Sequence, residues 1–162
     1  MLIYYNYRSE IPRIAYNILI VKTHDNYSML GAELGQEVGR IIGQRIVDAE
    51  GPKVESTFYA EGTFRTIAVT DLGTYLSIPR PDGALYGQGQ GVLTTIDGQI
   101  ATWIAQGLGR FTAPHVIRFR GSVIYHTDSS GSLAFINNIV AVFEYEVNGI
   151  GNTSARNWEW IY

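Results

Sequence analysis

Hydrophobic and polar residues alternate one by one along most of the chain from Gly35 onward. In residues 54–64, Phe58 and Phe64 fall on one face and Glu55 falls on the other. The same alternation continues in three later segments, residues 99–111, 116–127 and 153–162. A period of two is typical of β-strands that bury one face and expose the other.

Turn-forming residues separate these alternating segments. They occur at Pro81-Asp82-Gly83, Asp97-Gly98, Ser129-Ser130-Gly131 and Asn148-Gly149. Glycine, asparagine and aspartate tolerate the positive φ angles that tight hairpin turns require. Strands joined by short turns are antiparallel neighbours, so the pattern predicts an all-β sandwich or barrel.

Glycine repeats at alternate positions in two of the segments, at Gly87, Gly89 and Gly91 and then at Gly107 and Gly109. Glycine weakens a strand unless the sheet bends there or another group approaches closely. We therefore expect a closed antiparallel β-barrel of about eight strands over residues 35–162. The alternative is a flat sheet whose glycines face a bulky aromatic side chain such as Trp103.

The first 34 residues fit this pattern less well. Residues 14–21 are compatible with a strand and residues 28–34 with a short helix, although Gly31 and Gly35 weaken a helix. We expect residues 1–34 to form an extension that packs on the outside of the barrel.

One segment bears on assembly, because residues 139–143 are apolar on both faces. A strand of an antiparallel sheet with one wet face should alternate instead. We expect the outer face at Val140 and Val142 to be covered, either by the N-terminal segment or by a second subunit.

Composition narrows the class of protein. Charged residues make up 17% of the chain and the net charge is −3, which argues against a general nucleic-acid binder. There is no cysteine, so thiolate metal sites and cysteine nucleophiles are excluded. No apolar run near the start approaches the roughly 20 residues of a membrane span, and no signal peptide is evident. We expect a cytoplasmic protein without a membrane partner.

Several strings in the C-terminal half carry a resemblance to known proteins. They are Gly87-Gln88-Gly89-Gln90-Gly91, Gly107-Leu108-Gly109-Arg110-Phe111, Arg120-Gly121-Ser122 and Trp158-Glu159-Trp160. The sequence resembles a family of uncharacterised small microbial proteins, whose expected architecture is similar to the allene oxide cyclase and dirigent type of barrel. The resemblance implies eight antiparallel strands and a homo-oligomer, a dimer or a trimer. It transfers no functional residue, so cyclase activity is an analogy at the level of the fold.

Aromatic residues are the richest candidate feature. The side chains with inward parity on the later segments, together with Trp103, are Phe119, Val123, Tyr125, Phe143 and Tyr145. Aromatic residues around a lumen with a few polar groups form a pocket for a small, mostly apolar molecule. Alternatively, these side chains simply fill the lumen, because eight strands leave little more room than that.

Carboxylates supply the candidate catalytic groups. Glu144 shares a face with Glu146, and in a closed cavity repulsion and desolvation would raise the pKa of one of them. An isomerase or cyclase could then use Glu144 or Glu159 together with Arg120 and Tyr125. The alternative is that Glu144 and Arg120 form cross-strand ion pairs on a solvated face.

Other motifs are weaker. The glycines at 87–91 precede a strand and not a helix, which argues against a phosphate loop. His24, His115 and His126 have no metal-ligand spacing, and Ser122 lies about 13 Å from His126 along one strand, too far for a catalytic pair. We expect no metal and no cofactor. Three hypotheses remain: a ligand-binding barrel, an isomerase or cyclase, and a structural protein with a filled barrel.

Overall fold

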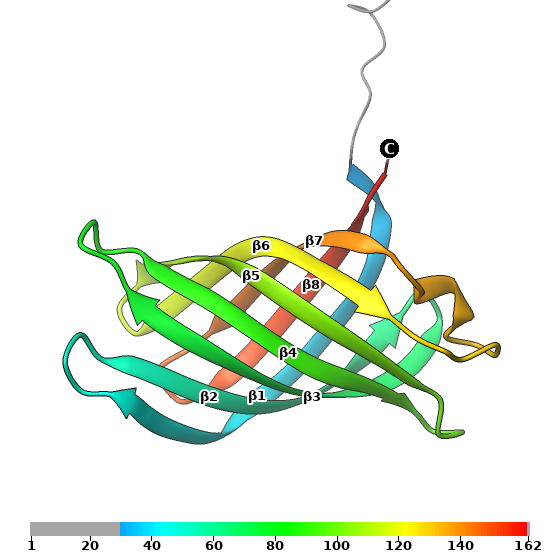
Figure 1. Cartoon of the computed structure of the whole chain (residues 1–162), viewed down its shortest axis with the longest axis horizontal. Helices are drawn as coiled ribbons and strands as arrows, with labels where there is room; N and C mark the ends of the chain where they lie inside the picture. The colour runs from blue at the N-terminus through cyan, green and yellow to red at the C-terminus, as the bar shows by residue number, and fades with distance from the viewer. Residues whose placement is uncertain (1–29, 162) are drawn as a thin grey trace, which may run out of the picture.

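The computed structural model describes residues 30–161, which form one closed barrel of eight antiparallel strands (Figure 1). The strands are β1 (Leu30–Asp48), β2 (Lys53–Phe64), β3 (Ile67–Pro79), β4 (Leu85–Thr95), β5 (Ile100–Ala113), β6 (Val116–His126), β7 (Val140–Val147) and β8 (Asn152–Trp160). Each strand pairs with its sequence neighbours, and β8 closes the sheet by pairing with β1. The closed antiparallel barrel predicted from the alternation is confirmed.

Side-chain burial follows the predicted parity. In β2, Phe58 and Ala60 are buried, whereas Tyr59 and Glu61, which alternate with them, are exposed. The same parity holds in β5, where Ala101 and Trp103 are buried. Alternate positions therefore point into the barrel, and the interior is built from one residue in two along every strand.

One end of the barrel is closed by the connection between β6 and β7, which carries a short 3₁₀ turn, η1 (Ala134–Ile136) (Figure 1). Leu133 and Ile136 of this connection are fully buried and belong to the same core cluster as Phe64 and Leu93. This end of the barrel is therefore a packed apolar plug.

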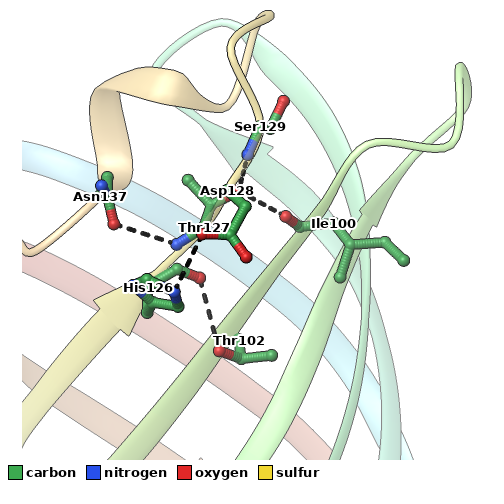
Figure 2. Close-up of polar contacts among 7 residues, drawn as sticks. All are labelled: Ile100, Thr102, His126, Thr127, Asp128, Ser129 and Asn137. Carbon is green, nitrogen blue, oxygen red and sulfur yellow. Dashed lines mark hydrogen bonds and ion pairs between the residues drawn. The ribbon is translucent and has the colours of Figure 1, made fainter.

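The plug is fastened to β5 through Thr127 (Figure 2). The buried Thr127 hydroxyl donates to the Ile100 carbonyl over 2.5 Å and accepts from the Ser129 amide over 3.0 Å. The Thr127 amide in turn donates to Asn137 Oδ1 over 3.2 Å. These bonds satisfy backbone groups just after β6 and at the start of β5, and they hold the connection across the barrel opening.

The hairpins β1–β2, β3–β4, β5–β6 and β7–β8 gather at the opposite end (Figure 1). The predicted turn glycines have the expected conformation at Gly83, on the β3–β4 hairpin, and at Gly98 on β4–β5, with φ angles of 80° and 79°. A side chain at either position would strain the backbone.

The N-terminal boundary needs a correction. From the sequence we assign residues 30–34 to the extension and find 28–34 compatible with a short helix, but the structure has Leu30–Leu34 inside β1. These residues pair with β8, where Glu33 lies opposite Trp158 and forms an ion pair with Arg156. Pairing with β8 satisfies the backbone without a helix, which Gly31 and Gly35 disfavour. Residues 1–29, which hold the rest of the expected extension and the expected strand, lie outside the described residues.

The segment that is apolar on both faces, residues 139–143, lies in β7 apart from its first residue, Ile139. Val142 points outward between Ser122 of β6 and Trp158 of β8, and both Val140 and Val142 are half-buried. A second subunit or the N-terminal segment as a further cover stays a prediction. The part of the chain described here has no helix long and apolar enough to cross a membrane.

Candidate functional site

The barrel interior holds a cavity of about 90 Å³ between the apolar plug and the opposite end. The structure places all six predicted lumen residues in its lining: Trp103, Phe119, Val123, Tyr125, Phe143 and Tyr145. Whether they bind a ligand stays a prediction. The cavity is large enough for several water molecules or for a small organic group.

Glycines make room for the large rings. A Cβ atom at Gly91 would lie 2.4 Å from Cζ2 of Trp103, and one at Gly73 would lie 2.6 Å from the same atom. At Gly109 a Cβ atom would lie 2.5 Å from the ring of Phe119. The repeated glycines therefore serve both purposes considered from the sequence, because the sheet is closed and its glycines face bulky aromatic rings.

The rings contact one another across the lumen. Phe58 of β2 stacks on Trp103 with ring centroids 6.1 Å apart, and it also meets Tyr145 at 5.6 Å. Tyr75 of β3 joins the group at 5.5 Å from Tyr145 and 6.0 Å from Phe119. These contacts stabilise the cavity wall and fix the ring positions, which makes the cavity a preformed one.

Two carboxyl groups lie in the middle of this apolar wall. Glu37 of β1 is 6% exposed and Asp71 of β3 is 3% exposed, and both line the cavity. The indole Nε1 of Trp103 donates to Asp71 Oδ1 over 2.9 Å. The two carboxyl groups also hydrogen-bond each other, with Glu37 as the donor.

Burial controls the protonation of this pair. It raises the pKa of Asp71 to about 7, although hydrogen bonds from Trp103 and Glu37 act in the opposite direction. Burial also raises the pKa of Glu37 well above its usual range, and the neighbouring charge of Asp71 raises it further. The pair therefore retains at least one proton near neutral pH, which is the state expected of two carboxyl groups that share an apolar site.

The pair has few partners. Glu37 Oε1 is buried and receives no hydrogen bond from the described residues. Within residues 30–161, no lysine, arginine or histidine lines the cavity. An unsatisfied buried acceptor costs free energy of folding, so the carboxyl pair lacks a hydrogen-bond donor in the ligand-free protein.

The carboxylates chosen from the sequence lie elsewhere. Glu144 forms an ion pair with Arg120 over 2.8 Å, and neither residue lines the cavity. This is the cross-strand arrangement on the outer face that the sequence left open as the alternative, and it keeps both groups away from the lumen. Glu159 has inward parity near the end of β8, but it does not line the cavity either.

The remaining motifs bring no second site together. The glycines at 87–91 are part of strand β4, as the sequence indicated. His126 lies 3.4 Å from Asp128, both of them largely exposed (Figure 2). Over residues 30–161, no three histidine or acidic side chains converge at a spacing that could hold a metal ion.

Sequence reasoning missed Glu37 and Asp71. In β1 the polar Glu37 points inward while its neighbour Val38 is 68% exposed, and in β3 Asp71 points inward while Leu72 is 52% exposed. The polarity of these two strands is thus inverted at the site. A strand whose alternation reverses within an otherwise regular barrel is the signal that could have found the pair.

Comparison with known proteins supports the barrel fold and identifies no function. No protein-family model matches the sequence, and no curated protein matches it significantly. A protein of unknown function from Clostridium acetobutylicum superposes with a TM-score of 0.68 at 14% identity, covering 79% of this chain and 96% of that one. A conserved protein of unknown function from Rhodopseudomonas palustris gives 0.65 at 14%, covering 80% and 97%.

A third solved structure, a beta-barrel like protein from Acinetobacter baumannii, gives a TM-score of 0.66 at 14% identity, covering 80% of this chain and 94% of that one. At this level of identity the likeness shows the shared barrel fold alone. The chain is therefore similar in fold to two proteins of unknown function and to one described as beta-barrel like.

Proposed function

We propose that this protein binds a small, mostly apolar molecule inside the barrel. The observation that carries the proposal is the interior cavity, whose aromatic walls surround a carboxyl pair with an unpaired acceptor, Glu37 Oε1. Binding sites for small molecules combine apolar walls with a small number of polar groups that fix orientation. The aromatic rings supply the apolar walls and Glu37 with Asp71 supplies the orienting groups.

The cavity is also the reason to prefer this function over a purely structural role. A barrel of eight strands can be filled completely by its own side chains. Here alanine occupies inward positions where larger residues would fill the space, at Ala105 and Ala155 in the cavity lining. Leaving a cavity costs stability, so its presence supports a ligand-binding role.

A second candidate function is an isomerase or cyclase acting on such a ligand. The specific observation in its favour is the pair Glu37 and Asp71, because carboxyl groups with raised pKa values can exchange protons with a substrate near neutral pH. In this version the acid–base groups are Glu37 and Asp71 in place of Glu144 and Glu159. The resemblance to allene oxide cyclase-type barrels belongs with this candidate.

Binding can be tested with n-butanol as a neutral, mostly apolar probe. We expect saturable shifts of the Trp103 indole resonance in ¹⁵N-labelled full-length protein as n-butanol is added. Ala155 pairs with Glu37 across β8 and β1 and lines the cavity. Ala155→Leu adds three carbon atoms to the cavity wall there, so it should lower the affinity at least tenfold. The matched control is Ser154→Leu, which changes the adjacent, exposed position and should leave the affinity within twofold.

Failure of n-butanol to shift any lumen resonance would contradict the proposal. Equal weakening of binding by both leucine variants would also contradict it, because the probe would then be bound outside the lumen.

Two further proposals follow from the sequence. We propose a cytoplasmic location and a homo-oligomer, with the outer face at Val142 as the contact between subunits. Light scattering on the purified protein tests the second of these, and a monomeric mass at micromolar concentration would contradict it.

A further inference from the structure

We propose that the ligand of the barrel is a protonated amine, an alkylammonium group held between the carboxyl pair and the aromatic walls. This inference rests on the proposed function, because it names the chemical class of the molecule bound in the lumen.

Charge is the first argument. Glu37 and Asp71 are buried together in the lumen, and within the described residues no basic side chain lines the cavity to balance them. A buried carboxylate without a cation is costly, and the free protein meets this cost by retaining a proton. An ammonium group can take the place of that proton, because it brings a full positive charge to the pair.

Hydrogen bonding is the second argument. Asp71 already accepts from Trp103, but Glu37 Oε1 has no donor among the described residues. The carboxyl pair is therefore short of hydrogen-bond donors. An ammonium group carries donors only, so it matches this deficit, whereas a carboxylate or phosphate ligand would add acceptors and like charge.

The walls are the third argument. Phe58 contacts both Trp103 and Tyr145 beside the cavity, and Tyr145 also contacts Tyr75 and Phe119. Cations are attracted to the electron-rich faces of aromatic rings, most strongly to tryptophan and when they are removed from water. The aromatic lining thus suits the charged head of an amine as well as its apolar chain.

Three probes of matched chain length distinguish the ligand classes. These are n-butylammonium, n-butanol and butyrate, which differ in charge and carry four carbon atoms each. Titration of the full-length protein at pH 8, followed by the Trp103 indole resonance, should show that n-butylammonium binds at least tenfold more tightly than n-butanol. Butyrate should not bind.

Neutral isosteres of the two carboxyl groups test the cause of this preference. The double variant E37Q/D71N keeps the size of both side chains and should bind n-butylammonium no more tightly than n-butanol. E144Q removes one carboxylate on the outer face and should keep the full preference. Thermal unfolding of each variant establishes that it is folded, and E37Q alone serves if the double variant is not.

The pH dependence of binding gives an independent test, because n-butylammonium stays charged from pH 6 to pH 8. The ionisable groups that face the pair are Tyr125 and Tyr145, whose pKa values burial raises above the usual range, so they stay neutral. Asp71 is the group that titrates, near pH 7. The affinity for n-butylammonium should therefore fall about tenfold from pH 8 to pH 6, as the proton returns to the pair.

The outcomes separate this inference from the proposed function. If n-butanol binds in the lumen as tightly as n-butylammonium, the inference of an amine ligand is overturned, and the lumen still binds a small apolar molecule. If E37Q/D71N keeps the preference for n-butylammonium, the carboxyl pair is not its cause and the inference is overturned. If no probe shifts a lumen resonance, both the inference and the proposed function fail.

Discussion

Trp103 of β5 donates its indole hydrogen to Asp71 of β3 over 2.9 Å, reaching across the intervening strand β4 inside the barrel. The indole can lie there because Gly73 and Gly91 have no side chains where its six-membered ring passes. One hydrogen bond thus connects the glycine pattern visible in the sequence with the carboxyl pair at the site. It also gives the buried Asp71 carboxyl group a hydrogen-bond donor from the protein.

Replacing Gly91 should displace this indole. In Gly91→Ala the new Cβ would lie 2.4 Å from Trp103 Cζ2, so the ring must move and its bond to Asp71 must weaken. We expect a loss of about 1–3 kcal/mol in the free energy of unfolding, measured with urea, and a large shift of the Trp103 indole resonance. Gly43→Ala is the control, because a Cβ there meets nothing within 4 Å. Equal stability of the two variants would contradict this account of the glycines.

The carboxyl pair should make the protein less stable as the pH rises. Both groups have folded-state pKa values above those of the unfolded chain, so the folded protein holds protons that the unfolded chain releases above about pH 4. Stability is thus highest below that pH and falls as the pH rises through the pKa of Asp71, about 7. We expect the free energy of unfolding to drop by at least roughly 2 kcal/mol from pH 5 to pH 8.

Urea unfolding of E37Q/D71N provides the comparison, because this variant should lose most of the pH dependence. Asp48 and Asp97 have lowered pKa values, from hydrogen bonds with Lys53 and Thr95 respectively. Their contribution is complete above pH 5 and does not affect the comparison. A wild-type protein more stable at pH 8 than at pH 5 would show that the pair is not buried as described.

Removing the Thr127 hydroxyl should loosen the plug. Thr127→Val leaves the Ile100 carbonyl and the Ser129 amide without the bonds they make in the structure. We expect a loss of about 1–3 kcal/mol in the free energy of unfolding and faster hydrogen exchange in the β6–β7 connection. Thr102→Val is the control, since the exposed Thr102 makes one bond of 3.4 Å to the His126 carbonyl (Figure 2). A plug unaffected by Thr127→Val would mean that apolar packing alone holds it.

The outer ion pair should matter little to the site. Arg120 and Glu144 are 70% and 38% exposed, and solvent screens their attraction. We expect Glu144→Gln and Arg120→Met to change the affinity for n-butylammonium by less than twofold. A tenfold loss in either variant would restore Glu144 and Arg120 as functional residues and contradict the placement of the site in the lumen.

The alternation of side chains predicted the barrel and much of its interior. It worked at Phe119 because the charged neighbours Arg118 and Arg120 are exposed, so polarity and parity agree there. It failed at Glu37 and Asp71, where a carboxyl group points inward beside an exposed Val38 or Leu72. Local polarity favours the opposite face there, and only closure of the sheet through six other strands overrides it. The residues that break the pattern are the ones that form the site.

The crystal structure of the protein grown with n-butylammonium at pH 8 tests the central claim most directly. The account predicts one molecule inside the barrel, its nitrogen within hydrogen-bonding distance of Glu37 and its chain against the rings of Phe58 and Trp103. A lumen that stays empty at saturating n-butylammonium, or density for the amine on the outer surface alone, would contradict it.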